Sequence, residues 1–333
     1  MTKACWAEWL ELARFAPSGH NTQPWLLDPV SDEEADLYYV PRRLLPVEDP
    51  TGRFSACFLG VFVEALNIAA AADRKQVALA HEPAPIDLSP GSEPRLYGRL
   101  HAGEGATTSI DRALLRRRRT SRLGYDGRPA PQAALDELAA LASGFGHEAR
   151  FFADPETVDW VVGLNADTLF YDLEEDDRRT EIGAWTHYSN RLASRAHDGF
   201  SPRCLGFPGP LLWLFFDHHG LIGGRRRRRI LRRIYLRSMR GTVHVGYLKA
   251  VWQTPEQCFD SGRLLMRLWL ELTRHGLVMQ PFGSVITNER SHGALVEKLG
   301  GGEAEDEIWL LFRLGYSATP PASERLARED LVR

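Results

Sequence analysis

Apolar residues recur at helical spacing in four long segments of the chain. In residues 4–15, tryptophans and aliphatic residues share one face, which predicts an amphipathic helix. Residues 56–72 are apolar almost throughout and too rich in alanine for a strand, so they predict a buried helix. Helical spacing returns at 131–143 and at 255–275, where Gly276 supplies a C-terminal cap.

Short apolar runs between these helices predict strands. In the first half the candidates are 25–28, 35–40, 77–80 and 95–100, and in the second half they are 149–152, 277–279 and 308–314. The second half thus replays the order of the first, which indicates a diverged internal duplication, although alternating helices and strands are common without one. We expect an α+β fold of two sheet-and-helix halves, residues 1–108 and 109–333, with an extra region at 174–250 that has no counterpart.

Composition narrows the class of protein. The chain has 333 residues, 44% hydrophobic and 26% charged, with a formal net charge of −3, so no global feature favours a nucleic-acid or membrane partner. Four widely spaced cysteines with no CxxC pair favour a reducing, cytoplasmic location over metal ligation or disulfides. The start lacks the apolar core of a signal peptide, and 211–216 is far shorter than the roughly 20 residues of a membrane span.

The segment APSGHNTQPW (16–25) is a polar turn between a predicted helix and a predicted strand. Ser18, Gly19 and Asn21 offer a hydroxyl, bare backbone and an amide to a flat polar ligand, and Pro17 stiffens the turn. The same residues would also serve a tight turn closed by Asn21, with Trp25 in the core. Both interpretations stay open on residue types alone.

A second polar segment, RRRRTSR (116–122), combines arginines with hydroxyls. Arginine forks match phosphate oxygens with two parallel hydrogen bonds, and Thr120 can add a third donor. Ser109 can cap a short helix from Ile110 that runs into these arginines. The alternative is a solvated basic face, which most such runs form.

Two further loops follow predicted strands. In Gln280-Pro-Phe-Gly-Ser284 a proline and a glycine fix the backbone path, so that its amides could meet the edge of a ring. Arg325 lies in PPASER (320–325), after the last predicted strand. Taken singly, the first is only a turn and the second only an exposed tail.

Together, the four segments resemble the nitroreductase family. APSGHNTQPW is similar to the family's helix-to-strand turn, and RRTSR followed by Tyr125 and Pro129 is similar to its flavin-phosphate motif. In that family the two motifs come from different subunits of an intertwined dimer. Here the turn lies in the first half and RRTSR opens the second, as in a fused pseudo-dimer with one surviving flavin site. The second half's equivalent turn, 141–147, has lost its proline and asparagine.

The resemblance implies one bound FMN and a set of residues that hold it. GLVMQPFGS (276–284) resembles the loop facing the flavin ring, and SER (323–325) resembles the terminal phosphate-binding pair, although Ser323 departs from the usual lysine. The implied FMN-binding residues are Pro17, Ser18, Gly19, Asn21, Arg118, Arg119, Thr120, Arg122, Pro281, Phe282, Gly283, Ser284 and Arg325.

The implied activity is electron transfer from NAD(P)H or a substrate through the flavin to a small-molecule acceptor, with no catalytic side chain and no metal. In layout the chain most resembles the fused nitroreductase-like proteins linked with mycobacterial dormancy. Some of these are thought to store flavin, so the alternative is a flavin-sequestering protein in which 174–250 covers the ring. The fused chain would be a monomer or a homodimer.

One more segment suggests another class of function. Residues 225–233 are rich in arginine and begin an amphipathic helix, which can bind membranes or nucleic acid. We favour a solvated face paired with the acids at 174–177. Glu181, Trp185 and His187 share a predicted helix that would either cap the flavin pocket or belong to core and surface.

Overall fold

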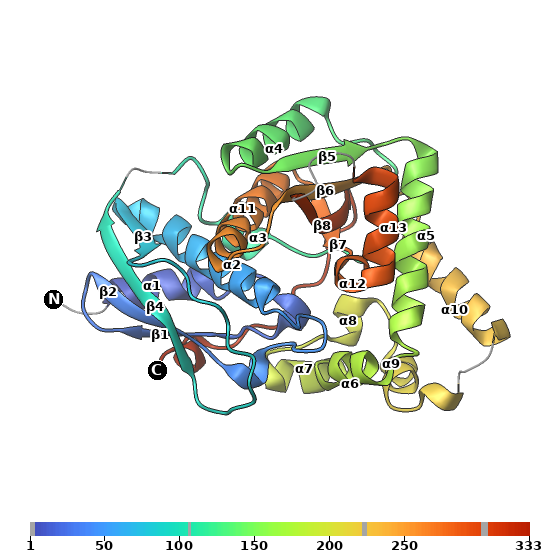
Figure 1. The fold of residues 1–333 in the computed structure, drawn as a ribbon, viewed down its shortest axis with the longest axis horizontal. Helices are drawn as coiled ribbons and strands as arrows, with labels where there is room; N and C mark the ends of the chain where they lie inside the picture. The colour runs from blue at the N-terminus through green and yellow to red at the C-terminus, as the bar shows by residue number, and fades with distance from the viewer. Residues whose placement is uncertain (1–3, 106–107, 222–224, 301–305) are drawn as a thin grey trace.

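The computed structural model describes residues 4–105, 108–221, 225–300 and 306–333 (Figure 1). Its strands form two four-stranded antiparallel sheets, so the α+β class is confirmed. The first sheet has the order β1-β2-β4-β3 and the second has the order β5-β6-β8-β7. The strands are β1 (Trp25–Pro29), β2 (Glu34–Tyr39), β3 (Lys75–Leu79), β4 (Arg95–Glu104), β5 (Glu148–Phe152), β6 (His244–Val251), β7 (Val278–Pro281) and β8 (Asp306–Gly315).

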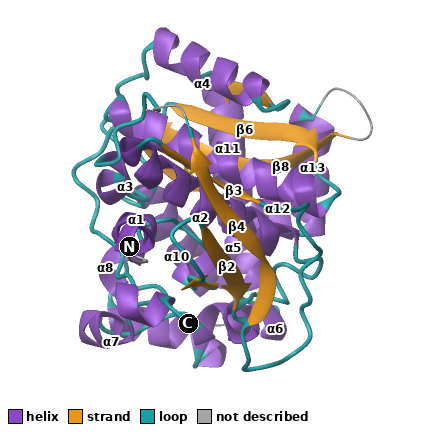
Figure 2. Cartoon of the chain, turned by 90° about the vertical axis from the view of Figure 1, so that its left-hand side faces the viewer, coloured by secondary structure: helices purple, strands orange, loops and turns teal. Residues whose placement is uncertain are grey.

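Both sheets follow the same path, in which the fourth strand of each lies between the second and the third. A long helix connects the second strand to the third in each sheet, and these two helices lie between the sheets (Figures 1 and 2). The helices are α1 (Ala4–Ala13), α2 (Arg53–Ala70), α3 (Leu114–Arg117), α4 (Gln132–Gly144), α5 (Pro155–Asp172), α6 (Asp176–Ala184), α7 (Asn190–Ala196), α8 (Pro202–Leu205), α9 (Gly209–Phe216), α10 (Arg225–Ser238), α11 (Pro255–Arg274), α12 (Gly283–Thr287) and α13 (Glu289–Leu299).

The predicted long helices and strands are confirmed to within a few residues, but three details are wrong or missing. β6 was not predicted, because the run HVGYLKAV is buried on both faces and lacks the alternation of a half-buried strand. It occupies the end of the region 174–250, so the segment between adjacent strands β5 and β6 is 153–243. The short helix α3 begins at Leu114, not Ile110, and Ser109 does not cap it. Trp185 and His187 lie beyond the end of α6 and share no helix with Glu181.

The centre of the molecule is the crossing of α2 and α11. A Cβ atom on Gly60 would lie 1.9 Å from the carbonyl oxygen of Phe259, and one on Gly262 would lie 1.8 Å from that of Cys57. Each glycine is the eighth residue of its helix, counted from Arg53 and from Pro255. Only glycine permits this reciprocal close approach of the two backbones.

Helix α2 is also long and apolar enough to cross a membrane, but 89% of the window that meets this test is buried inside the protein. Its apolar residues belong to the larger hydrophobic core, which joins both sheets through α2 and α11. We therefore interpret α2 as a core helix.

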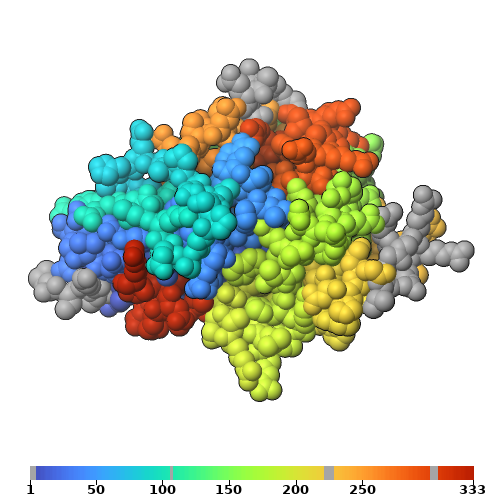
Figure 3. Space-filling view, turned by 60° about the horizontal axis from the view of Figure 1, so that its bottom comes forward, coloured from blue at the N-terminus to red at the C-terminus, as the bar shows by residue number. Residues whose placement is uncertain are grey.

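The inserted segment 153–243 and the C-terminal tail both return to the first half. The inserted helices α6 and α7 lie at the bottom of Figure 1, below α2, and the C-terminus lies beside β1. Figure 3 shows the yellow-green part of the insertion as a lobe against the first-half surface. The backbone amide of Leu326 donates to Gln23 Oε1 at 2.9 Å, and that of Arg333 donates to the Leu27 carbonyl at 3.1 Å. The first contact brings the C-terminal tail to the turn at 17–23, and the second fastens its end to β1.

Candidate functional site

A cavity of about 350 Å³ lies where the two halves, the inserted segment and the C-terminal tail meet. This is within the usual size range for a small-molecule or cofactor site. Twelve of the thirteen residues predicted from the sequence line it: Pro17, Ser18, Gly19, Asn21, Arg118, Thr120, Arg122, Pro281, Phe282, Gly283, Ser284 and Arg325.

The turn at 17–23 is held in an unusual backbone conformation by its own side chains. His20, Asn21 and Gln23 have φ values of 45°, 59° and 50°, which non-glycine residues rarely adopt. Ser18 Oγ accepts from the amide of Gln23 at 2.9 Å, and Asn21 Nδ2 donates to the carbonyls of Gly199 and Glu324 at 3.2 and 3.0 Å. The polar side chains therefore close the turn, as the local interpretation predicts, while the same residues line the cavity.

Arg118 is the most informative residue of the site. It is 4% exposed, and its guanidinium lies 4.4 Å from the ring centroid of Trp269. Nη2 makes a long hydrogen bond of 3.4 Å to the carbonyl of Phe15, whereas Nε and Nη1 have no partner. Buried guanidinium nitrogens without acceptors are costly, which indicates a place for an anion.

Arg325 approaches the same carbonyl from the C-terminal tail. Its Nη2 lies 3.5 Å from the oxygen of Phe15, Nη1 donates to Asn21 Oδ1, and Nε has no partner. Among the described residues, no carboxylate forms an ion pair with Arg118, Arg122 or Arg325. We call these three residues the arginine cluster.

The electrostatics agree with this geometry. Burial lowers the pKa of Arg118 well below its ordinary value, and the charges of Arg325 and Arg119 lower it further. Burial and Arg119 likewise lower the pKa of Arg325, to about 10. Burial also lowers the pKa of Arg122, whose guanidinium lies 5.1 Å from the Phe200 ring centroid. The protein gathers buried positive charge here without supplying the counter-charge.

Arg119 is the one predicted residue that does not line the cavity. Its Nη1 donates to the carbonyls of Arg116 and Arg118. The chain leaves α3 at Arg118 in an extended conformation, and Thr120 forms an isolated parallel bridge with Met279 of β7. Side chains alternate along an extended segment, so residues 118, 120 and 122 face the cavity while 119 faces away.

The segment 281–284 joins β7 to α12 and lines the cavity. Phe282 is 1% exposed and packs in the core formed around the inserted segment. Its amide donates to the carbonyl of Leu311 at 2.8 Å, which anchors the start of α12. Pro281, Gly283 and Ser284 then lie along the cavity wall.

Sequence reasoning missed a cluster of polar residues near the turn, which we call the polar corner: the ionisable His20, Glu48, Asp172 and Arg178, together with Thr287. His20 Nε2 lies 3.0 Å from Glu48 Oε2, and Arg178 Nε lies 3.8 Å from Asp172 Oδ1. Arg178 Nη2 donates to the carbonyl of Thr287 at 2.9 Å. His20, Glu48 and Thr287 line the cavity.

The pKa values of the two carboxylates in the polar corner shift in opposite directions. Burial alone would raise the pKa of Glu48, but its pairing with His20 and the charge of Arg178 outweigh this, and the net pKa is lowered. Burial raises the pKa of Asp172 to about 6, although Asn288 donates to its Oδ1 at 2.9 Å. Glu181, the one nearby residue that the sequence singled out, accepts from the amides of Val47 and Glu48, each at 2.9 Å.

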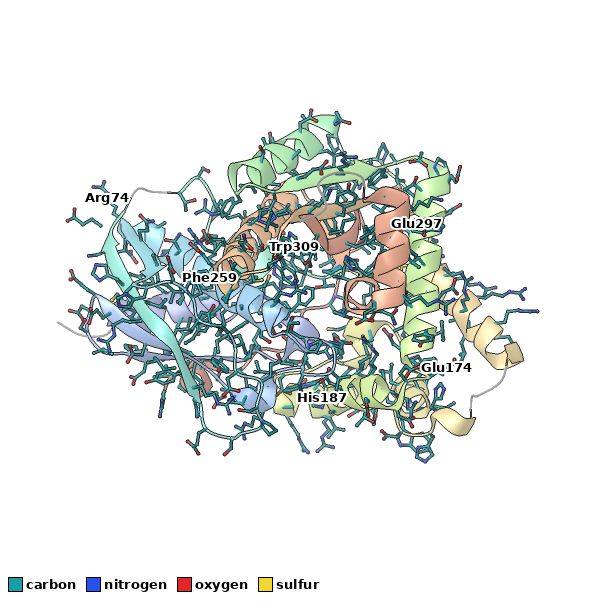
Figure 4. All side chains as sticks on the ribbon, viewed as in Figure 1. Arg74, Glu174, His187, Phe259, Glu297 and Trp309 are labelled. Atoms are coloured by element: carbon teal, nitrogen blue, oxygen red, sulfur yellow. The ribbon has the colours of Figure 1, made fainter. Side chains whose placement is uncertain are left out.

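The inserted segment supplies a third kind of wall, and we call it the apolar chamber. Its residues are aliphatic or aromatic except for two with uncharged polar side chains. They are Asn165, Leu169, Phe170, Leu173, Ile182, Phe200, Leu205, Phe207, Leu212, Phe215, Phe216, Leu231, Ile234, Tyr235, Ser238 and Met239. Trp309, labelled in Figure 4, closes the cavity from β8 on the side of the second sheet.

The loop that follows α7 joins the insertion to the first half. His187 Nε2 lies 3.2 Å from Asp198 Oδ1, and Arg43 Nη1 lies 3.3 Å from Asp198 Oδ2. The amide of Gly199 donates to the carbonyl of Asn21 at 3.2 Å. Figure 4 shows His187 on this side of the molecule, below the two sheets. The insertion is thereby fastened directly to the turn at 17–23.

The basic helix predicted from residue 225 is present as α10, and its Arg232 forms an ion pair with Asp167 of α5. The predicted pairing of the arginine run with the acids at 174–177 stays a prediction. The side chains of residues 225–228 lie outside the described residues. Tyr235 is buried and Leu231 half-buried, whereas Ile230 is 57% exposed and Ile234 is 41% exposed. One face of α10 therefore packs on the chamber.

No protein-family model and no curated protein matches the chain. Among solved structures it is similar to the FMN-dependent nitroreductase NfnB from Mycobacterium smegmatis in complex with NADPH, at 16% identity and a TM-score of 0.40 over 66% of this chain and 95% of that chain. It is also similar to the FMN- and NADPH-dependent nitroreductase NfnB from Sphigopyxis sp. strain HMH, at 17% identity and a TM-score of 0.39 over 66% of this chain and 96% of that chain. A nitroreductase with bound FMN from Bacteroides fragilis matches at 13% identity and a TM-score of 0.37 over 65% of this chain and 92% of that chain. These are partial likenesses of fold, and the dormancy-associated subtype stays a prediction.

Proposed function

We propose that this protein binds one FMN in the cavity and acts as a nitroreductase-like oxidoreductase, passing electrons from reduced nicotinamide or a substrate to a small-molecule acceptor. The observation that carries the proposal is Arg118: a buried guanidinium on the cavity wall with two unpartnered nitrogens and no carboxylate. A phosphate dianion would supply both the acceptors and the counter-charge.

Three groups of cavity residues would each hold one part of FMN. The arginine cluster and the Thr120 hydroxyl would hold the phosphate. The turn at 17–21 would follow the ribityl chain, and 281–284 would lie against the ring. When bound, FMN supplies two-electron chemistry by accepting a hydride and returning electrons to an acceptor.

The protein itself would position the cofactor, surround it in part with apolar side chains and exchange protons with the ligand. The apolar chamber would line one side of the cavity with side chains that do not bind water. The polar corner places His20 and Glu48 on the cavity wall, where they could exchange protons with a ligand. No serine or cysteine nucleophile is needed for this chemistry.

One observation favours the alternative, a flavin-sequestering protein. The loop at 197–200 is bonded to Asn21 and to Arg43, so the insertion fastens onto the turn that would hold the flavin. A cover fixed in this way would hold a ring in place and limit the access of electron donors.

We also infer that the two halves arose by an internal duplication. The two sheets share one strand order, and α2 and α11 meet through reciprocal glycine contacts. In this account the single chain forms its own pseudo-dimer, working as a monomer or as a homodimer in the cytoplasm.

The two functions are separated by adding NADPH to the FMN-loaded protein without oxygen. An oxidoreductase loses its yellow absorbance within seconds and regains it when a nitroaromatic compound is added. A sequestering protein stays yellow. A protein that holds no FMN after incubation with an excess of it would rule out both.

A further inference from the structure

We infer that the apolar chamber is a subsite for the hydrocarbon chain of an amphiphilic substrate, whose redox-active head lies beside the proposed ring-facing residues 281–284. This inference rests on the proposed function, because the head group must meet a flavin. It goes beyond that function by naming the class of substrate, a lipophilic one with an extended chain.

The first support is the absence of charge from one side of the cavity. Charged residues on the described wall, Arg43, Glu48, Asp49 and the arginine cluster, all come from outside the segment 165–239. That segment contains many charged residues, yet the side chains it contributes to the wall are aliphatic, aromatic or uncharged polar. A site for a second anion or for a sugar would need polar side chains here.

The second support is that the polar groups of the chamber are already bonded. Asn165 Nδ2 donates to the Tyr235 hydroxyl at 2.7 Å, and Ser238 Oγ donates to the carbonyl of Tyr235 at 2.6 Å. The contrast with Arg118 is direct, since its Nε and Nη1 have no partner. One end of the cavity requires a ligand with acceptors, and the other end requires none.

The third support is the shape of the chamber. Leu212 and Phe215 of α9 are 2% and 7% exposed and form its inner wall. Ile234 of α10 lines the same cavity and is 41% exposed, so it marks an edge that solvent reaches. An extended chain fits a space with an apolar interior and an open edge, and its burial is favourable in proportion to the apolar area removed from water.

The hydrocarbon chain would belong to a substrate that exchanges electrons with the flavin, because the chamber and the proposed ring-facing residues 281–284 share one cavity. A benzoquinone with an alkyl tail is a suitable probe of this class. Its reduction to the quinol takes two electrons and two protons, of which reduced nicotinamide gives a hydride and solvent gives the second proton. The tail itself does not react.

The test compares two benzoquinones with the same head, one carrying a decyl tail and one a methyl group. Their dissociation constants are measured by calorimetry on the FMN-loaded protein. Each buried methylene contributes roughly fourfold in affinity, so the decyl compound should bind at least about tenfold more tightly. Equal affinities would overturn the inference.

Two substitutions on α10 localise the effect. Ile234→Trp narrows the open edge and should reduce the decyl preference severalfold. Ile230→Trp is the matched control, because Ile230 lies one turn away, is 57% exposed and does not line the cavity. If both variants lower the preference equally, the tail does not enter beside Ile234 and the assignment fails.

The outcome also separates this inference from the proposed function. A protein that holds FMN but does not distinguish the two quinones lacks the chain subsite and keeps the function. A protein that takes up no FMN but still prefers the decyl compound keeps the subsite and loses the function.

Discussion

Two hollows beside α2 and α11 are lined by arginines, which are paired with an acid in one hollow and not in the other. In the main cavity, Arg118 lies against Trp269 and no described carboxylate pairs with it. A smaller hollow of about 220 Å³ is lined by Asn67, Arg263 and Arg267 among others. There Glu64, which is fully buried, accepts from Arg263 Nε at 3.2 Å and from Arg267 Nε at 2.6 Å.

The two hollows are lined by residues at equivalent positions of α11 and α2. Trp269 is the fifteenth residue from Pro255, and Asn67 is the fifteenth from Arg53. In the smaller hollow an acid of the protein pairs with the arginines, and in the main cavity no described acid pairs with Arg118. The comparison teaches that arginines alone do not indicate an anion site, and that the informative case is a buried arginine whose nitrogens lack acceptors.

The largest expected effect comes from removing the acid of the smaller hollow. Glu64→Ala leaves Arg267 without its counter-charge and Arg263 with Asp260 alone, so the free energy of unfolding should fall by roughly 3 kcal/mol. Both arginine side chains are about one-third exposed, which keeps the loss at the lower end of the range for buried pairs. Denaturant unfolding measures it.

The control for Glu64 is Asp167→Ala, which breaks the exposed pair with Arg232 and should cost less than about 1 kcal/mol. Equal losses in the two variants would mean that burial of Glu64 does not matter. FMN binding should be unchanged in Glu64→Ala, since Glu64 does not line the main cavity.

Removing Arg118 from the main cavity should weaken ligand binding and leave the stability of the ligand-free protein unchanged. Arg118→Ala should weaken FMN binding roughly tenfold to a hundredfold, because it deletes charge-assisted hydrogen bonds to the phosphate. Without ligand its stability should not fall, since the residue has no counter-charge there. Arg117→Ala is the control, because Arg117 is exposed in the same run. Unchanged FMN affinity in Arg118→Ala would remove the phosphate assignment.

The smallest effect concerns the buried acid of the polar corner. The folded pKa of Asp172, about 6, is above the ordinary value. The unfolded chain therefore loses this proton first as pH rises, and stability falls between about pH 4 and pH 6 and stays lower above that window. Asp172→Asn cannot ionise, so it should lack this loss and be more stable than the wild type at pH 7 by about 2 kcal/mol. Identical pH profiles of unfolding would contradict the assignment.

The sequence predicted those parts of the structure that short-range patterns determine. Helical spacing located α2 and α11, and a proline-rich turn and an arginine run located two segments that meet at the cavity. Arg118 and Arg119 could not be told apart, because the extended backbone after α3, fixed by the bridge of Thr120 to Met279, decides which side chain faces inward.

Other features depend on tertiary contacts that no local pattern records. The polar corner draws His20 from the turn, Glu48 from the loop before α2 and Asp172 from the end of α5. The apolar chamber is assembled from five helices and the loops between them, and each contributes only a few side chains. β6 was missed because burial on both faces removes the alternation that marks a strand.

An equilibrium titration of the ligand-free protein with FMN tests the central claim most directly. The account predicts saturation at one FMN per chain, with inorganic phosphate competing, because only one of the two hollows leaves its arginines without an acid. Saturation at two per chain would show that neutralisation by Glu64 does not close the second hollow. No binding at all would contradict the assignment of the arginine cluster to a phosphate.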